Sequence, residues 1–386
     1  MDLAPLSADR VRVLVINAGS SSLKASVLEP PGRDAVATAE FDWGADATRV
    51  AGRDSAIVEV VEAIASAGIA PSTIDAVGYR VVHGGTRFTA PTRIDDMVIK
   101  AIEELSSLAP LHNRIAAETI RAGRDRLPRV PHVAVFDTAF HASLTPAAYR
   151  YAVPERWFRD WGIRRFGFHG LSVAWSTGRA AELLQRPLVE LRLVVAHLGS
   201  GCSVTAVDAG RSAETSMGMT PLEGLVMGTR AGSIDPGVIL DLLRRSLLSL
   251  PQLEDALDHG SGLLGVSGMS ADVRELLAAE GAGDEAAALA LELFVRRAAA
   301  GIAGIASAIP SLDALVFTGG IGENSGPIRK RIVDRLGVLG IREIAANDVL
   351  EDALLSAPPA RPAVLRIAAR EDVVIADGVR ALLETA

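Results

Sequence analysis

The stretch from Val13 to Lys24, V-L-V-I-N-A-G-S-S-S-L-K, constrains the fold of this chain more than any other. Val13 to Ile16 form a short unbroken apolar run, which is typical of a strand covered on both faces. The turn that follows supplies an amide, a glycine, three hydroxyls and the cation of Lys24. Gly19 permits a close backbone approach, so the turn suits an oxyanion such as phosphate. The chain contains no Walker A motif, and an ordinary serine-rich hairpin turn is the alternative interpretation.

Composition excludes several classes of protein. The chain has 386 residues, 49% of them hydrophobic, and a formal net charge of −8. These values predict a soluble globular protein of two or more domains and argue against nucleic acid as its main partner. The single cysteine, Cys202, cannot form an intrachain disulfide or a cysteine-based zinc site. We therefore expect a cytoplasmic protein in which this thiol packs as a small apolar group.

Two segments bear on secretion and membranes. The first ten residues contain no apolar stretch of the kind that a signal peptide needs. The longest apolar segment, Leu289–Ile309, is interrupted by Glu292, Arg296 and Arg297, which a membrane span rarely tolerates. We therefore predict no membrane partner and interpret this segment as a core helix or a dimer-interface helix.

Strand-like apolar runs alternate with helical periodicity along much of the chain. This alternation predicts an α/β protein whose central sheets are covered by helices. The expected strands are Val11–Ile16, Ala76–Val82, His132–Phe136, Leu191–Ala196, Ala314–Phe317 and Ala363–Ile367, and the expected helices are Ser55–Ala67, Asp96–Leu108, Leu289–Ile309 and Asp372–Leu383.

The sequence also contains a faint internal similarity. Val13–Val27 can be aligned with Leu193–Val207 so that their glycine-serine pairs coincide, and in both segments a strand leads through a small-residue turn into a second strand. Together with the length of the chain, this similarity suggests two related lobes that face a nucleotide cleft. The boundary would follow Thr138, and the last helix would pack back on the first lobe.

Three glycine-rich turns follow strands and can seat phosphate groups, because their backbone N–H groups point into the turn. They are Asn17–Ser22, His197–Gly201 and Gly319–Asn324. The segment Gly260–Gly265 also matches the dinucleotide pattern G-x-G-x-x-G. It follows a helical segment rather than a strand, so we reject it as a dinucleotide site.

Four charged residues stand where a ligand would be bound. Arg80 lies inside an apolar run, and Arg230 is flanked by glycines. A guanidinium is costly to bury without an anion and fits a carboxylate or a phosphate, although a buried ion pair is an equal alternative for each. Asp137 and Glu371 each follow a strand and suit Mg²⁺ beside a polyphosphate. Their alternative roles are helix capping for Asp137 and compensation of a helix dipole for Glu371.

Among the histidines, His169 has the most unusual surroundings. It lies in R-R-F-G-F-H-G, residues 164–170, where two arginines, two glycines and two aromatic rings favour a site near an anion. His112 and His197 are intermediate cases. No histidine spacing typical of a zinc site occurs in the chain.

These segments together resemble the acetate kinase family, within the superfamily of acetate and sugar kinases, Hsp70 and actin. The matches run in one order over nearly the whole chain, which is far more specific than any single loop. The motifs are VLVINAGSSSLK (13–24), RVVHGG (80–85), LAPLHN (108–113), VFDTAFH (135–141), RRFGFHG (164–170), HLGSG (197–201), ETSMGMTPLEGLVMGTR (214–230), IDPG (234–237) and GGIGEN (319–324).

The resemblance implies a duplicated, two-lobed fold of the ribonuclease H-like, actin-like type, with central mixed sheets flanked by helices. The first lobe would comprise residues 1–138 and 371–386. The second, 139–370, would carry most of the nucleotide contacts and the interface of a homodimer. The implied reaction is reversible in-line phosphoryl transfer from ATP to the carboxylate of acetate, which gives acetyl phosphate and ADP, with Mg²⁺ or Mn²⁺ as the metal.

The resemblance also implies roles for individual residues. The catalytic residues of the family correspond to Arg80, Asp137, His169 and Arg230, and its metal-site residues to Asn17 and Glu371. Arg80 also belongs to the substrate-binding set, whose other members are Val82, Leu111, His112, Phe168 and Pro221. The nucleotide contacts correspond to Lys24, His197, Leu198, Gly199, Ser200, Gly201, Asp272, Val273, Arg274, Gly320, Ile321, Gly322, Glu323 and Asn324.

The chain departs from the family pattern at several positions. Ser200 stands in HLGSG where the family usually has Asn, Ser233 replaces an Asp, and Arg114 replaces a Pro. Arg370 precedes Glu371 where the family reads N-E-E. This last change adds a cation next to the expected metal ligand, so metal affinity or nucleotide preference can differ from the family norm.

Two other functions stay open. Propionate kinase is the near alternative, because one extra methylene changes binding by only about 1–3 kcal/mol. The distant alternative is a non-catalytic, nucleotide-gated interaction protein like actin or Hsp70, which needs no acceptor site; the retained catalytic residues argue against it. A sugar kinase is disfavoured, because a hydroxyl acceptor does not require two arginines.

Overall fold

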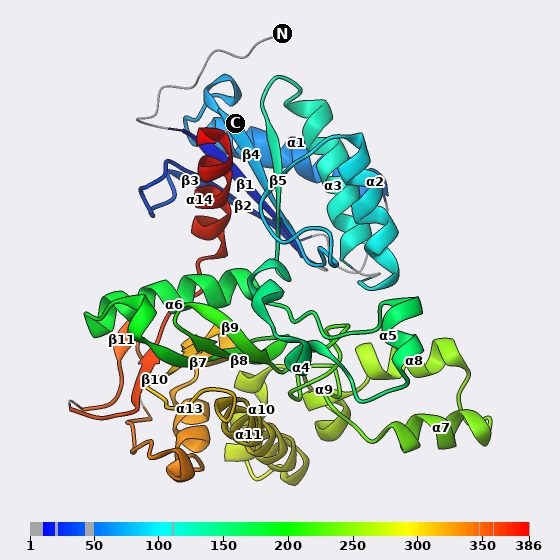
Figure 1. The fold of residues 1–386 in the computed structure, drawn as a ribbon, viewed down its shortest axis with the longest axis vertical. Coiled ribbons are helices and arrows are strands. Elements are labelled where there is room, and N and C mark those ends of the chain that lie inside the picture. Colours follow the sequence, from blue (N-terminus) through cyan, green and yellow to red (C-terminus); the bar gives the residue numbers. More distant parts are fainter. Residues whose placement is uncertain are drawn as a thin grey trace. The chain divides into compact units, whose positions relative to one another are not determined.

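The computed structural model describes residues 11–19, 22–42, 50–109, 112–346, 348–357 and 359–385. The chain divides into two compact units, the first made of Met1–Ala142 with Arg370–Ala386 and the second of Ser143–Ala369. Each unit has a central sheet with helices on its two faces (Figure 1). The predicted α/β class, with two mixed sheets flanked by helices, is confirmed.

Over the described residues, each unit has one six-stranded sheet, and the two sheets share a topology. The strand order is β3-β2-β1-β4-β6-β5 in the first unit and β11-β12-β10-β7-β8-β9 in the second, which repeats the first when read backwards. The strands are β1 (Val13–Ala18), β2 (Ser22–Leu28), β3 (Ala37–Asp42), β4 (Ala76–Val81), β5 (Thr92–Arg93) and β6 (His132–Phe136), then β7 (Arg192–Leu198), β8 (Cys202–Asp208), β9 (Arg211–Thr215), β10 (Ala314–Thr318), β11 (Ala353–Leu354) and β12 (Ala363–Arg366).

The pairing of the strands explains the internal similarity of the sequence. β1 pairs antiparallel with β2 and parallel with β4, and β7 pairs antiparallel with β8 and parallel with β10. The segments that align in sequence are therefore the equivalent hairpins of the two sheets. The Asn17–Ser22 turn joins β1 to β2, as the hairpin interpretation required, although Ser20 and Ser21 lie outside the described residues.

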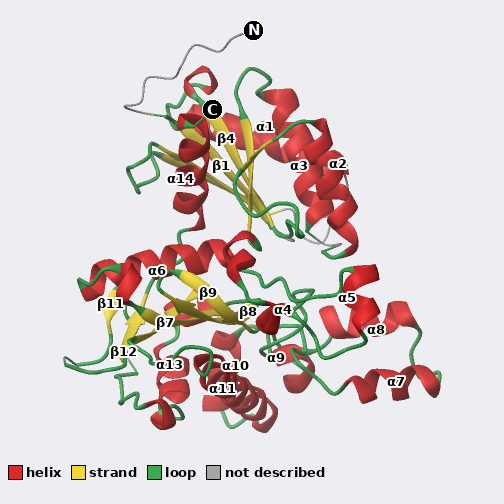
Figure 2. Cartoon of the chain, in the orientation of Figure 1, coloured by secondary structure: helices red, strands yellow, loops and turns green. Residues whose placement is uncertain are grey.

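Helices cover both faces of the first sheet. They are α1 (Val50–Ser66), α2 (Asp96–Glu104), α3 (Asn113–Arg126) and α14 (Glu371–Glu384). α1 and α3 pack on one face, with α2 beside α3, and α14 packs on the other (Figure 2). A Cβ at Gly78 would lie 2.7 Å from Ile375 Cγ2 and 2.9 Å from Val379 Cγ2, so the close approach of α14 to β4 depends on this glycine. The expected packing of the last helix on the first unit is observed.

The second sheet lies between α6 on one face and α11 on the other (Figure 1). α11 buries Leu291, Phe294 and Ile302, as expected for a core helix, but it begins before Leu289 because Asp284 caps it through the N–H of Ala287. The helices of this unit are α4 (Pro146–Tyr149), α5 (Glu155–Trp161), α6 (Gly170–Leu184), α7 (Pro236–Arg244), α8 (Leu250–Asp258), α9 (Gly262–Ser267), α10 (Val273–Gly281), α11 (Glu285–Ala306), α12 (Gly319–Asn324) and α13 (Gly326–Val333).

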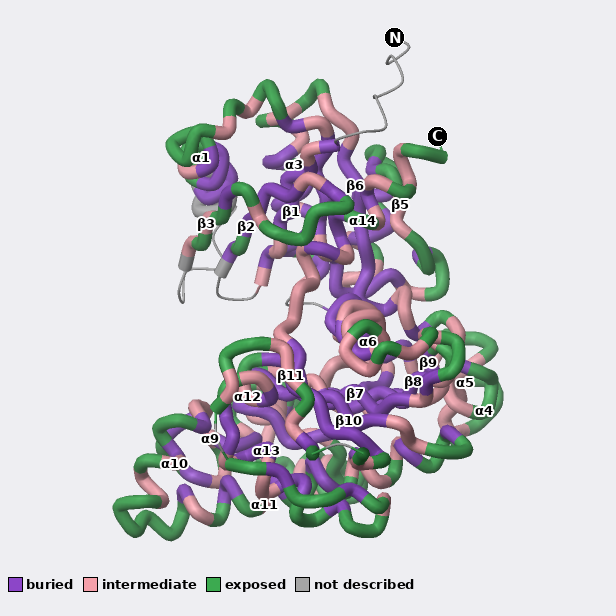
Figure 3. The backbone as a smooth tube through the Cα atoms, turned by 90° about the vertical axis from the view of Figure 1, so that its left-hand side faces the viewer, coloured by how far each residue is buried: buried purple, intermediate pink, exposed green. Residues whose placement is uncertain are grey.

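Burial follows these layers. The central strands are buried in both units, and the outward turns of the helices are exposed (Figure 3). Gly260–Gly265 follows α8 and forms the start of α9, with a helix rather than a strand before it, so the rejection of a dinucleotide motif there is confirmed. Among the helices described here, not one has both the length and the hydropathy that crossing a bilayer requires.

Candidate active site

Four polar side chains of the first unit meet at the carboxyl ends of β1, β4 and β6 and at the start of α14. Arg80 donates from Nη2 to Asp137 Oδ2 at 2.6 Å and from Nε to both Asp137 oxygens at 3.1 and 3.2 Å. Its Nη1 donates to Asn17 Oδ1 at 3.2 Å. Asn17 Nδ2 donates to Glu371 Oε2 at 3.1 Å, which lies 3.5 Å from Arg80 Nε. The structure thus brings together four residues that the sequence singles out.

Burial controls the charges in this cluster. The Asp137 side chain is 1% exposed and that of Arg80 is 17% exposed. Burial, with a contribution from Glu371, raises the pKa of Asp137 to about 6, against the opposing effect of Arg80. Burial would lower the pKa of Arg80, but Asp137 and Glu371 outweigh it and raise the pKa above its ordinary value. The guanidinium is therefore a fixed cation between two carboxylates.

The cluster supplies oxygen donors that suit Mg²⁺. In the described part of the chain, no group of three or more His, Cys, Asp or Glu side chains is arranged to hold a metal. Glu371 and Asn17 form a smaller, all-oxygen set. This set fits Mg²⁺, because Mg²⁺ is usually held by one or two carboxylates and completes its shell with water and substrate phosphates.

In the second unit, two histidine rings stack on each other. His169 and His197 have ring centroids 4.1 Å apart and an interplanar angle of 22°. The Nδ1 of His169 is 3.0 Å from Ser203 Oγ, and the Nδ1 of His197 is 2.8 Å from Ser172 Oγ. Both serines are fully buried. Each hydroxyl fixes the orientation of the ring that it contacts through Nδ1.

Gly201 brings His169 near to Arg230. A Cβ on Gly201 would lie 3.2 Å from His169 Nε2 and 3.8 Å from Arg230 Nη1, so both groups border this glycine. Within the described residues, the polar contacts of the Arg230 side chain are long, 3.5 Å from Nη1 to Pro221 O and 3.7 Å from Nε to Asp258 Oδ1. Burial lowers the pKa of Arg230, with partial compensation by Asp258. This is an incompletely neutralised cation, which suits an anionic ligand.

The turn after β10 forms the short helix α12, which contains the predicted nucleotide contact Glu323. Two arginines that sequence reasoning missed, Arg329 and Arg366, donate to its backbone. Glu323 Oε1 accepts from the N–H groups of Gly319 and Ala369, both at 2.9 Å. The fully buried Arg329 donates to Glu323 O at 2.8 Å, and Arg366 donates to the same carbonyl at 3.2 Å. One of these residues could have been found from the sequence: Arg366 is a charged residue inside the expected apolar strand Ala363–Ile367, and a charge there indicates a buried polar contact.

The remaining predicted residues have mixed surroundings. Val82 and Phe168 are buried, and Leu111 lies outside the described residues. His112 stands at the N-cap of α3 without a side-chain capping bond. Asp272 caps α10 through the N–H of Arg274 at 2.8 Å. Lys24 lies on β2 with Nζ 3.0 Å from Glu40 Oε1. These placements do not assign roles, which stay predictions.

Comparison with known proteins identifies the family. The model of the acetokinase family matches residues 12–377 of this chain.

The chain belongs to the acetokinase family.

An acetate kinase of Deinococcus radiodurans is 46% identical to this acetokinase-family chain over 382 residues, which cover 94% of this chain and 96% of the relative. The crystal structure of Porphyromonas gingivalis acetate kinase superimposes with a TM-score of 0.86 at 33% identity and covers 97% of this chain and 100% of its own. A propionate kinase from Francisella tularensis also superimposes with a TM-score of 0.86, at 34% identity, with 95% of this chain and 98% of its own covered.

The structure gives local explanations for three departures from the acetokinase pattern. Arg370 binds Asp372, from Nε to Oδ1 at 2.9 Å and from Nη2 to Oδ2 at 3.0 Å, so its charge is paired there rather than with Glu371. Ser233 Oγ accepts from the N–H of Gly224 at 3.1 Å. Arg114 is a surface residue that pairs with Glu118 at 3.0 Å.

Cys202 is fully buried, and burial raises the pKa of its thiol to about 12, in agreement with the expected packing role.

Proposed function

We propose that this protein is an acetate kinase that catalyses reversible phosphoryl transfer between ATP and the carboxylate of acetate. The observation that carries the proposal is the pair of arginine-centred clusters, Arg80 with Asp137 in the first unit and Arg230 beside His169 in the second. Membership of the acetokinase family supports it. We also propose a cytoplasmic location, since the single cysteine, Cys202, is a buried free thiol.

The proposed chemistry needs little from a base. The carboxylate oxygen of acetate is already a nucleophile, so it attacks the γ-phosphorus of ATP as the bond to the bridging oxygen of ADP breaks. Catalysis then consists of positioning and charge neutralisation along the in-line path. In the proposal we assign the binding of the acetate carboxylate to Arg80, and the other substrate contacts to Val82, Leu111, His112, Phe168 and Pro221.

The transferring phosphoryl group carries its charge on three equatorial oxygens. We assign the stabilisation of this charge to Arg230 and to the Nε2 of His169. Asn17 and Glu371 would hold Mg²⁺, or Mn²⁺ in its place, which supplies further neutralisation of the phosphates. The nucleotide contacts are assigned to Lys24 and to the segments 197–201, 272–274 and 320–324.

The reaction can be tested by trapping acetyl phosphate with hydroxylamine in the presence of ATP, Mg²⁺ and acetate. We expect acetohydroxamate to form in proportion to ADP. A protein that binds ATP but forms no acyl phosphate from any short-chain acid would instead support the non-catalytic, nucleotide-gated alternative.

The preference of this protein for acetate or propionate has to be determined by kinetics, because the fold does not distinguish the two. The chain superimposes on an acetate kinase and on a propionate kinase with the same TM-score, 0.86. We expect kcat/KM to decrease from acetate to propionate to butyrate. A higher value for propionate than for acetate would make propionate kinase the correct assignment.

We also propose that the protein is a homodimer through α7 and the turn that follows it. α7 buries none of its residues in the unit. Four apolar side chains here are about half exposed or more: Val238 (48%), Leu240 (57%), Leu247 (52%) and Leu250 (59%). Such a run of exposed apolar side chains is unusual for one contiguous segment of a monomer.

We expect light scattering to give twice the chain mass for the wild type and the chain mass for Leu240→Glu/Leu247→Glu. Val189→Glu, at a residue 71% exposed elsewhere, is the control and should stay dimeric; a monomeric wild type would contradict the proposal.

A further inference from the structure

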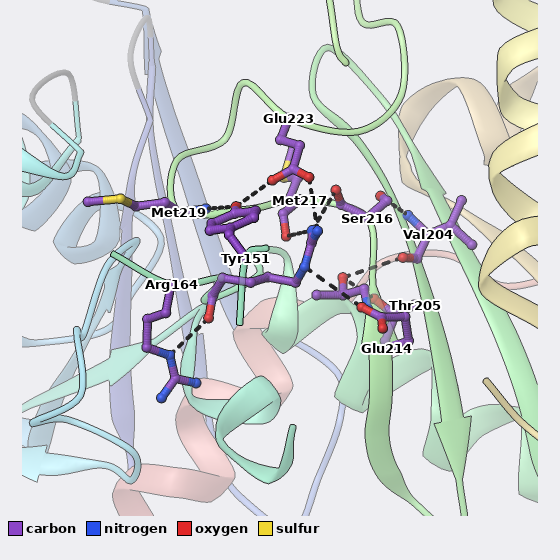
Figure 4. Close-up of polar contacts among 11 residues, drawn as sticks. Tyr151, Arg164, Val204, Thr205, Glu214, Ser216, Met217, Met219 and Glu223 are labelled. Atoms are coloured by element: carbon purple, nitrogen blue, oxygen red, sulfur yellow. Dashed lines mark hydrogen bonds and ion pairs between the residues drawn. The ribbon is translucent and has the colours of Figure 1, made fainter. Parts of the chain in front are cut away.

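The side chains of Tyr151, Arg165 and Glu223 in the second unit form a hydrogen-bonded network along the segment 216–223 (Figure 4). The proposed mechanism gives no role to these three side chains. Arg165 Nη1 donates to the carbonyl oxygens of Ser216 at 3.1 Å and Met217 at 2.9 Å, and its Nη2 donates to Glu223 Oε1 at 2.9 Å. The hydroxyl of Tyr151 donates to the other oxygen, Glu223 Oε2. Glu223 thus accepts from a cation and from a phenol at the same time.

The network fixes both ends of the segment. The oxygen of Tyr151 accepts from the N–H of Met219 at 2.9 Å while its hydrogen goes to Glu223. The Arg165 side chain is 16% exposed and that of Glu223 is 33% exposed, so their charge-assisted bonds are only partly screened by water. Tyr151, four residues before α5, and Arg165, after it, therefore hold the path of the chain from Ser216 to Glu223.

Gly218 shows how closely the network packs. A Cβ at this position would lie 1.8 Å from Glu223 Oε2 and 2.2 Å from the Tyr151 hydroxyl oxygen, so any side chain would displace both groups. The carbonyl of Gly218 accepts from the N–H groups of Phe166 at 3.0 Å and Gly167 at 3.2 Å. The network therefore holds the segment 216–223 against the backbone that leads directly into Phe168 and His169.

The same segment reaches two other groups of the site. Pro221 lies within it, and its carbonyl is the acceptor of the 3.5 Å contact from Arg230 Nη1. Ser216 Oγ accepts from the N–H of Val204 at 2.9 Å, and Ser216 N–H donates to Val204 O at 2.9 Å. Val204 follows Ser203, whose hydroxyl orients the His169 ring. A shift of the segment would thus move the supports of both Arg230 and His169.

We propose that Tyr151, Arg165 and Glu223, with Gly218 as the residue that admits them, are positioning residues that set the distance between His169 and Arg230. They act through the segment 216–223 and its contacts to Pro221 and Ser203. The proposal rests on the proposed function, because it assigns the network to the acceptor and phosphoryl side of the reaction. The hydrogen bonds and ion pairs of these three side chains described above go to residues 214–223 and to one another. We therefore expect the acceptor side to respond more strongly than the nucleotide segments 197–201 and 320–324.

The main test is Tyr151→Phe, which removes one oxygen and keeps the ring. We expect kcat to fall about 10- to 100-fold, since misplacement of about 1 Å can cost 10²-fold. KM for acetate should rise, and KM for ATP should stay within about twofold, which a general loss of folding would not produce.

Tyr149→Phe is the matched control. It removes a phenol oxygen two positions away that makes no hydrogen bond within the described residues, and its kinetic constants should equal those of the wild type.

Two further variants separate positioning from loss of structure. Glu223→Gln keeps the shape but replaces one of the two accepting oxygens by an NH2 group, so Arg165 or Tyr151 then faces a donor instead of an acceptor. Tyr151→Phe/Glu223→Gln should be no worse than the poorer single variant, because residues of one network are not additive. Gly218→Ala should reproduce their kinetic pattern. Gly178→Ala, where a Cβ meets nothing within 4 Å, should be neutral.

The results that would contradict the role of the network differ from the results that would contradict the proposed reaction. A wild type that forms no acyl phosphate removes the proposed function and this inference with it. An active wild type with Tyr151→Phe and Glu223→Gln both within twofold of it in kcat and in KM for acetate overturns the network alone. Equal increases in KM for acetate and ATP, or additive losses in the double variant, would also overturn it.

Discussion

Arg230→Ala is expected to lower kcat/KM for acyl phosphate formation by about 10³-fold or more, because an arginine that neutralises the transferring phosphoryl group contributes on this scale. Stability should change little. The two protein contacts of Arg230 are long, 3.5 and 3.7 Å, and burial lowers its pKa, so its cation gains little from the folded protein. We expect the free energy of unfolding to change by less than about 1 kcal/mol.

A large loss of kcat/KM with little change in the free energy of unfolding distinguishes a catalytic arginine from a structural one. Steady-state kinetics and urea unfolding on the same preparation measure both effects. Arg230→Lys keeps the charge but not the fork of donors, and it should recover only part of the rate. Arg211→Ala, at an exposed site on β9, should leave both quantities unchanged. If Arg230→Ala still phosphorylates acetate within tenfold of the wild type, the role given to Arg230 is wrong.

Arg80→Ala should be as damaging to the rate and, unlike Arg230→Ala, damaging to the fold. Arg80 is the cation bound to the buried Asp137 carboxylate. Its removal leaves that carboxylate unpaired beside Glu371, and breaking a buried pair in this way costs about 3–5 kcal/mol. We expect this loss of unfolding free energy in urea titrations, together with a fall in kcat/KM of about 10³-fold.

The stability loss should depend on pH. The pKa of Asp137 in the folded wild type is about 6, above its ordinary value of 3.8. A raised pKa favours the folded state below the ordinary value, and this contribution is lost as pH rises through about 6. Without Arg80 the pKa of Asp137 rises further, so the variant should continue to lose stability above pH 6, where the contribution of Asp137 to wild-type stability no longer changes.

The double variant Arg80→Ala/Asp137→Asn is the control for this interpretation. It removes the unpaired charge, so it should recover much of the unfolding free energy and lose the pH dependence, while the rate stays low. An Arg80→Ala protein as stable as the wild type at pH 8 would show that Asp137 does not depend on Arg80 for its charge.

The sequence predicted those parts of the fold that carry a strong periodic or apolar signal. All six expected strands exist, because central strands of a covered sheet are apolar throughout. β3 and β9 were missed because they are polar edge strands, A-T-A-E-F-D and R-S-A-E-T, and β5 and β11 because they have two residues each. The end of α2 was placed at Leu108, but the helix stops at Glu104 and continues as a 3₁₀ turn, Leu105–Ser107.

The site was predicted through motifs, and its supports were not. Asn17, Arg80, Asp137 and Glu371 stand out in sequence because each lies in an apolar strand or follows one, and they are neighbours in the structure. The partners that orient the site come from distant segments with ordinary composition. Ser203 on β8 and Ser172 on α6 bind the two histidines, and a lone serine in a strand or a helix gives no signal of such a role. Tertiary hydrogen bonds of this kind are invisible to local patterns.

The return of the chain to the first unit has a consequence for its synthesis. The first unit ends at Ala142 and resumes only at Arg370, after the whole of the second unit. α14 supplies the buried Val373, Ile375 and Val379 to the sheet made of the earliest strands, and its first residue is Glu371. A growing chain therefore keeps one face of its first sheet uncovered until the second unit and α14 have been synthesised, and chaperone protection would be most needed over that interval. The helix that closes this core also supplies Glu371 to the cluster around Arg80, so a chain that stops before Arg370 lacks both.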